Sequence, residues 1–78
     1  MKHLVQPNLI LQYLFDQKGI EGLDLVELDV WNNSKITNVS FMKNLKKLDA
    51  SGSGCGIDQK GIEGLDLVEL NVWNNIFF

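Results

Sequence analysis

Residues 16–33 read DQKGIEGLDLVELDVWNN, and residues 58–75 read DQKGIEGLDLVELNVWNN. The two stretches lie 42 positions apart and differ at one position, where Asp29 in the first corresponds to Asn71 in the second. Self-similarity at a fixed period of this size is the sequence signature of repeat architectures. We call residues 16–33 the first repeat, residues 34–57 the middle unit and residues 58–75 the second repeat.

A short apolar pattern in each repeat predicts a strand. Leu25, Leu28 and Val30 form the series LxxLxV, which recurs in the second repeat, and a related series, LxxLxA, begins at Leu45 in the middle unit. The first leucines of the three series are 20 and then 22 residues apart, so the 42-residue period contains two alternating units. A strand with its leucines on one side buries them by stacking on parallel copies. The pattern therefore predicts a parallel sheet of about three strands.

The stretch DQKGIEGL precedes this strand in both repeats. Its two glycines disfavour a long helix, because each costs about 1 kcal/mol in a helix interior. Ile20 and Leu23 are spaced for a single helical or 3₁₀ turn with two apolar anchors. Asp16 and Asp58 stand where they can cap such a turn.

The series LxxLxLxxN, carried by residues 25–33 and 67–75, resembles the leucine-rich repeat family. The resemblance covers residues 16–75 and implies an α/β-type solenoid, with a concave parallel sheet and irregular or 3₁₀ convex connections. It implies that Asn33 and Asn75 form a hydrogen-bonded ladder between coils, weakened where Ser53 replaces the asparagine. We expect one domain with the solenoid over residues 16–78, whose core also takes Ile36 and Phe41 from the middle unit.

Residues 1–15 have no counterpart 42 positions later. Apolar residues after Pro7 recur at offsets of three and four, which predicts a short helix starting at Pro7. A strand or a mobile tail is the alternative. Because repeat arrays need a terminal unit over the open end of their core, we predict that residues 1–15 form a helical N-terminal cap.

Composition narrows the class of protein. A net charge of −3 leaves no basic patch for a nucleic-acid backbone. The single cysteine, Cys55, excludes a disulfide framework within the chain and favours a cytoplasmic location. No stretch approaches the ~18 apolar residues of a membrane span, and Pro7 interrupts the only segment similar to a signal peptide. We therefore expect neither nucleic acid nor a membrane as partner.

The residues between the leucines project from the opposite face of the sheet, which the resemblance makes the concave face. Stacking the units in register predicts four rows across it: Glu27, Lys47, Glu69; Asp29, Asp49, Asn71; Trp31, Ser51, Trp73; Asn32, Gly52, Asn74. The first row alternates in charge, which favours this order of units.

Two rows carry candidate chemistry. Asp29 and Asp49 could share a proton or hold a hard cation, but calcium needs six or more oxygens and nothing nucleophilic lies nearby. We therefore predict no metal, no cofactor and no catalytic residue. Trp31 and Trp73 flank Ser51 and could form a slot for a partner or a flat ligand; alternatively, each indole packs over its own loop.

These features predict a non-enzymatic protein-interaction module that binds an unidentified protein through the first three rows. The alternative is a structural, self-assembling unit without an evolved ligand, consistent with recent duplication or deliberate construction. The last predicted strand has an open edge, and Ile76, Phe77 and Phe78 follow it. An open edge beside apolar residues invites pairing between chains, so we expect a homo-oligomer.

Overall fold

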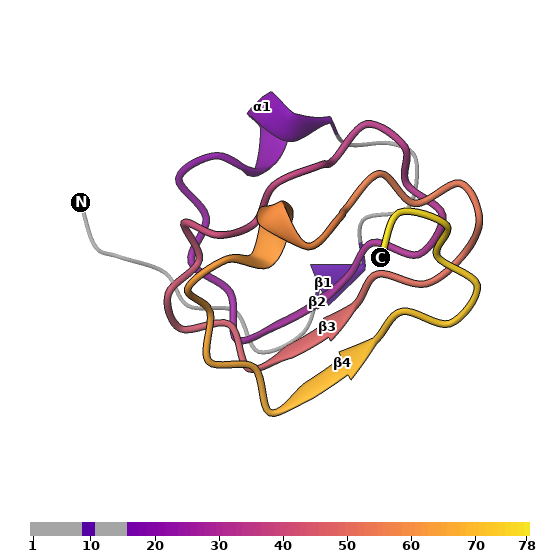
Figure 1. Cartoon of the computed structure of the whole chain (residues 1–78). Coiled ribbons are helices and arrows are strands. Elements are labelled where there is room, and N and C mark those ends of the chain that lie inside the picture. Colours follow the sequence, from indigo (N-terminus) through magenta and orange to yellow (C-terminus); the bar gives the residue numbers. More distant parts are fainter. Residues whose placement is uncertain (1–8, 11–15) are drawn as a thin grey trace.

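The computed structural model describes Leu9–Ile10 and residues 16–78, and four short strands form one sheet (Figure 1). The strands lie in chain order: β1 (Leu9–Ile10), β2 (Glu27–Asp29), β3 (Lys47–Asp49) and β4 (Glu69–Asn71). All neighbouring strands are parallel, so each connection returns the chain to the start of the next strand. The prediction of a small parallel sheet is confirmed, with four strands instead of three.

The pairing register places the predicted rows side by side. Leu28 pairs with Leu48, and Leu48 with Leu70, so their flanking residues align as well. The alignment continues beyond the strands, because Asn32 N donates to Ser51 O at 2.9 Å. The predicted register is thus confirmed for the strands and for the residues that directly follow them.

The predicted N-terminal helix is wrong at Leu9 and Ile10. These residues form β1, in which Leu9 pairs with Leu28 and Ile10 with Asp29. The open edge of β2 offers a row of unpaired main-chain groups, and pairing with it outweighs a helical spacing of apolar residues. The other parts of the predicted cap, residues 1–8 and 11–15, lie outside the described residues.

The predicted single turns are present before β2 and β4 as the helix α1 (Gln17–Ile20) and the 3₁₀ helix η1 (Lys60–Ile62). Asp16 Oδ1 accepts from Gly19 N at 2.9 Å, and Asp58 Oδ1 accepts from Gly61 N at 2.9 Å. Both N–H groups also donate to the backbone carbonyl of the same aspartate, at 3.1 Å and 3.0 Å, so each carboxylate adds a second acceptor at the start of its turn, as predicted.

The core lies between the sheet and the connections. Its buried apolar residues come from the first repeat and the middle unit: Ile20, Leu25, Leu28, Val30, Ile36, Val39, Met42, Leu45, Leu48, Ala50, Cys55 and Ile57. The prediction that Phe41 fills the core is wrong, because its side chain is 37% exposed and the adjacent Met42 is buried instead.

The two repeated asparagines bind backbone groups. Asn33 is fully buried, and its Oδ1 accepts from Lys35 N at 2.8 Å and Ile36 N at 3.0 Å. Asn75 Nδ2 donates to the carbonyls of Ala50 and Ile57 in the middle unit, at 2.7 Å and 3.0 Å. The equivalent Ser53 is exposed. The asparagine at this position therefore ties the second repeat to the unit before it.

Candidate interaction site

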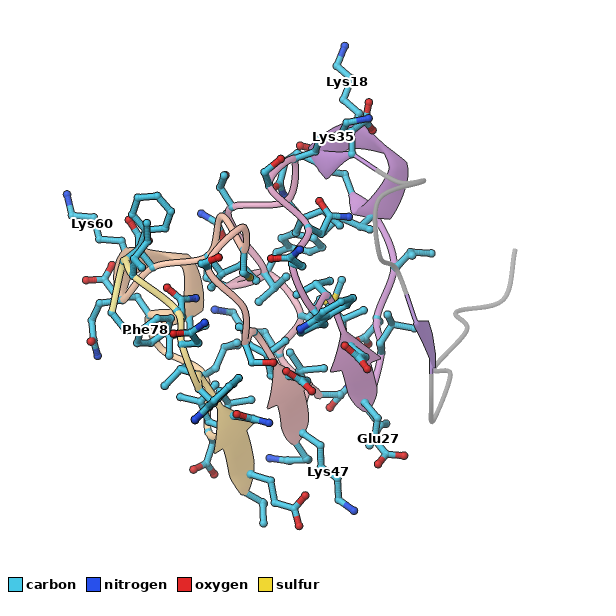
Figure 2. All side chains as sticks on the ribbon, turned by 90° about the vertical axis from the view of Figure 1, so that its right-hand side faces the viewer. Lys18, Glu27, Lys35, Lys47, Lys60 and Phe78 are labelled. Carbon is cyan, nitrogen blue, oxygen red and sulfur yellow. The ribbon has the colours of Figure 1, made fainter. Side chains whose placement is uncertain are left out.

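An open groove of about 450 Å³ crosses strands β2, β3 and β4. Its lining consists of Glu27, Leu28, Asp29, Lys47, Leu48, Asp49, Glu69, Leu70 and Asn71. We call this the sheet groove. Figure 2 shows Glu27 and Lys47 projecting from the sheet on the side away from the connections. Six of the nine predicted concave-face residues line the groove, and the Trp31, Ser51, Trp73 row lies just beyond its end.

The groove is predominantly acidic. Four carboxylates, from Glu27, Asp29, Asp49 and Glu69, accompany a single ammonium group, that of Lys47. Lys47 Nζ lies 3.5 Å from Glu27 Oε2, and both side chains are partly exposed. An exposed pair of this kind adds at most about 1 kcal/mol to stability. Because Lys47 pairs with Glu27 on β2, it does not neutralise Glu69 on β4, the outer strand of the groove.

The side chains of the Asp29, Asp49 and Asn71 row bind backbone N–H groups just after the strands end. One side-chain oxygen of each accepts from the backbone N–H two residues later, at 3.0 Å. Ser51 Oγ also donates to Asp49 Oδ1, at 2.5 Å. A carboxylate and an amide both supply this acceptor, which is why asparagine can replace aspartate at position 71. Among the described residues, no group of three or more His, Cys, Asp or Glu side chains could hold a metal ion.

The two tryptophans have different surroundings. Trp31 is 41% exposed and Trp73 is 76% exposed. The Trp31 indole reaches over the middle unit, with Nε1 3.2 Å from the position that a Cβ on Gly52 would occupy. Ser51, predicted as a binding residue between them, is only 5% exposed. Trp73 is therefore the indole most available to a partner.

The Asn32, Gly52, Asn74 row has a conformational role that the sequence prediction missed. All three residues adopt positive φ, of 59°, 98° and 62° respectively. Asparagine and glycine tolerate this left-handed region best. A Cβ on Gly52 would also lie 2.9 Å from Asn32 Oδ1, so this position needs glycine for space as well. The recurrence of Asn and Gly after each strand was the signal that could have revealed this turn.

A second candidate surface lies at the C-terminal end of the sheet. Its exposed apolar residues are Val68 (74%), Leu70 (40%), Trp73 (76%), Ile76 (68%), Phe77 (55%) and Phe78 (39%). We call these six residues the β4 end surface. Figure 2 shows Phe78 on the side of the molecule that carries β4, opposite β1. The three residues predicted for self-association all belong to this surface.

Cys55 has the environment of an inert thiol. It is fully buried and free. Burial raises the pKa of the thiol, and the carboxylates of Asp49 and Asp29 raise it further. Because the thiolate is the reactive form, this environment suppresses nucleophilic chemistry at Cys55.

The chain matches no protein-family model, and comparisons with curated proteins and with solved structures give no significant match. Within β1 and residues 16–78, no helix has the length and apolar character needed to cross a membrane. The function is therefore inferred from the surfaces of the chain itself.

Proposed function

We propose that this chain is a non-enzymatic protein-interaction module, built as a short leucine-rich-repeat solenoid, and that the sheet groove is its binding face. The observation that carries the proposal is the acidic groove with the exposed Trp73 at its end. The in-register stacking of units and the bonds from Asn75 to the middle unit support the solenoid architecture.

The groove favours an extended, basic segment of a protein partner. Its excess of carboxylates attracts lysine and arginine side chains. An exposed indole also attracts a guanidinium group through its ring face. An arginine-containing strand crossing the groove would satisfy both features. The free, buried thiol of Cys55 fits a reducing compartment, and we place the interaction in the cytoplasm.

Calorimetric titration with a short peptide of alternating arginine and serine tests this function, with the glutamate analogue as control. We expect binding of the basic peptide, weakened at least several-fold by either Glu69→Gln or Trp73→Ala. Glu63→Gln is the matched control variant, since Glu63 is exposed but lies outside the groove. Equal binding of both peptides, or unchanged affinity in both groove variants, would contradict the proposal.

A second candidate function is that of a structural unit which assembles with itself through the β4 end surface. A specific comparison favours it: Leu28 is 3% exposed, whereas the equivalent Leu70 is 40% exposed. The near-identity of the repeats fits recent duplication or construction for such a role. Sedimentation velocity over a range of concentrations tests it, and a strict monomer would rule out this candidate while leaving the groove proposal intact.

A further inference from the structure

The first repeat shows how much surface a neighbouring unit covers. The edge of β2 that points toward the following unit is covered by β3 of the middle unit. No described segment covers the equivalent edge of β4 in the second repeat. Trp31 is 41% exposed and its equivalent Trp73 76%, and the leucine at the centre of the strand changes from 3% in Leu28 to 40% in Leu70. Since these residues are chemically identical, the difference in exposure measures an unoccupied contact surface.

The main chain of the first repeat is bonded across the same side. Val26 O accepts from Lys47 N at 3.1 Å, and Val30 N donates to Asp49 O at 2.9 Å. Residues at even positions of this strand thus direct their N–H and C=O groups toward the middle unit. Their equivalents in the second repeat are Val68, Leu70 and Val72.

In the second repeat Leu70 and Val72 face outward, whereas Val68 N still donates to Lys46 O at 2.7 Å. Glu69 N donates to Lys46 O at 3.0 Å, and Asn71 O accepts from Ala50 N at 2.8 Å, so these two residues face β3. Successive residues of a strand direct their backbone groups to opposite edges. The N–H and C=O of Leu70 therefore point away from the sheet, and they offer a template for a further strand.

We propose that β4 pairs antiparallel with β4 of a second molecule of this chain. The two-fold axis passes midway between the two Leu70 residues. This proposal rests on the self-assembly candidate and names its geometry. Leu70 then faces Leu70 of the second molecule, Glu69 faces its Asn71, and Val68 faces its Val72. Such an interface uses the same surface on both molecules, so one contact covers both open ends.

The only difference between the repeats supports this pairing. Asp29 of the first repeat corresponds to Asn71, which lies on the edge strand. An aspartate at position 71 would place a carboxylate opposite Glu69 twice in the antiparallel pair, and like charges directly opposite destabilise a sheet. Asn71 removes this repulsion while its Oδ1 still accepts from Trp73 N at 3.0 Å.

The exposed residues of the β4 end surface set an upper limit on the apolar area that a second molecule can cover. The exposed fractions of its six residues correspond to roughly 700 Å² of apolar surface per molecule, against about 800 Å² per partner in a standard interface. The antiparallel main-chain bonds at Leu70 would add direction and register to this apolar contact.

Cysteine cross-linking tests the register. Directly opposite residues of an antiparallel pair have Cα atoms about 5 Å apart, within the range of a disulfide. Leu70→Cys is expected to cross-link to itself under mild oxidation. Val68→Cys and Val72→Cys are each expected to stay uncross-linked alone and to cross-link when mixed. The wild-type chain is the control, because its own Cys55 is buried.

Charge variants provide a second readout that does not depend on Leu70. By sedimentation equilibrium, we expect Asn71→Asp to weaken the dimer and Asn71→Lys to tighten it, each by about two- to thirty-fold for two symmetric pairs. A strict monomer would overturn this proposal and the self-assembly candidate together. A dimer that is insensitive to residue 71 and is not cross-linked at residue 70 would overturn only the two-fold pairing.

Discussion

Replacing Asn33 by alanine is expected to lower the free energy of unfolding by about 2–4 kcal/mol. The buried Oδ1 of Asn33 accepts from Lys35 N at 2.8 Å and from Ile36 N at 3.0 Å. Alanine removes this acceptor, and a buried donor left unsatisfied costs about 1–3 kcal/mol. A domain of this size has a total stability of about 4–12 kcal/mol, so the loss would be a large fraction of it.

The chain supplies its own controls at the two equivalent positions. Asn75→Ala removes bonds to the carbonyls of Ala50 and Ile57, but Asn75 is half-buried at the end of the sheet and water can replace part of the loss. We expect a cost of about 1–2 kcal/mol. Ser53→Ala should change stability by less than about 0.5 kcal/mol, because Ser53 is exposed.

Urea unfolding followed by tryptophan fluorescence measures all three variants, at a low protein concentration that limits association. The expected order of destabilisation is Asn33→Ala, then Asn75→Ala, then Ser53→Ala, with an unchanged denaturant slope. A Ser53→Ala variant as unstable as Asn33→Ala would refute the reasoning, as would an Asn33→Ala variant indistinguishable from the wild type.

Three further predictions concern the turns, the groove and the thiol. Gly52→Ala is expected to cost about 1–3 kcal/mol in thermal unfolding, because a φ of 98° and a Cβ 2.9 Å from Asn32 Oδ1 add strain to overlap; a neutral substitution would contradict this conformation. Asp16→Ala should cost about 0.5–2 kcal/mol through loss of the cap, whereas Lys47→Ala should cost less than about 1 kcal/mol because its ion pair is exposed; the reverse order in urea unfolding would count against both assignments. Burial raises the pKa of Cys55 above its ordinary value of 9.0, so the unfolded thiol ionises first and stability should fall as the pH rises above 9.0. Cys55→Ala should remove that part of the pH dependence of unfolding, and an identical slope in the variant would exclude the thiol as its cause.

The strand positions and their register could be predicted because the sequence repeats. Leu28, Leu48 and Leu70 each occupy the centre of a strand, and the period of two along a strand then fixes which residues share a face. The caps at Asp16 and Asp58 were also predictable, since a side-chain acceptor before a short turn acts locally. These features depend on patterns within a few residues, repeated often enough to remove ambiguity.

Features that depend on contacts between units were not predictable from local patterns. Leu9 and Ile10 fit a helical spacing, but the edge of β2 draws them into a strand. Phe41 and Met42 are adjacent apolar residues, and only the shape of the core determines which one is buried. The contact of the Trp31 indole with Gly52 likewise depends on a side-chain direction that the spacing of residues does not reveal.

Amide hydrogen exchange at Val30 and Val72 tests the central claim most directly. The two residues are equivalent, but among the described residues only Val30 has a strand on the side that its N–H faces. Val30 N donates to Asp49 O at 2.9 Å, whereas Val72 N faces the outer edge of β4. We predict strong protection of Val30 at every concentration, and protection of Val72 that appears only as the concentration rises and the second molecule pairs. Equal protection of the two amides in dilute solution, or a Val72 amide that remains unprotected at high concentration, would contradict the account.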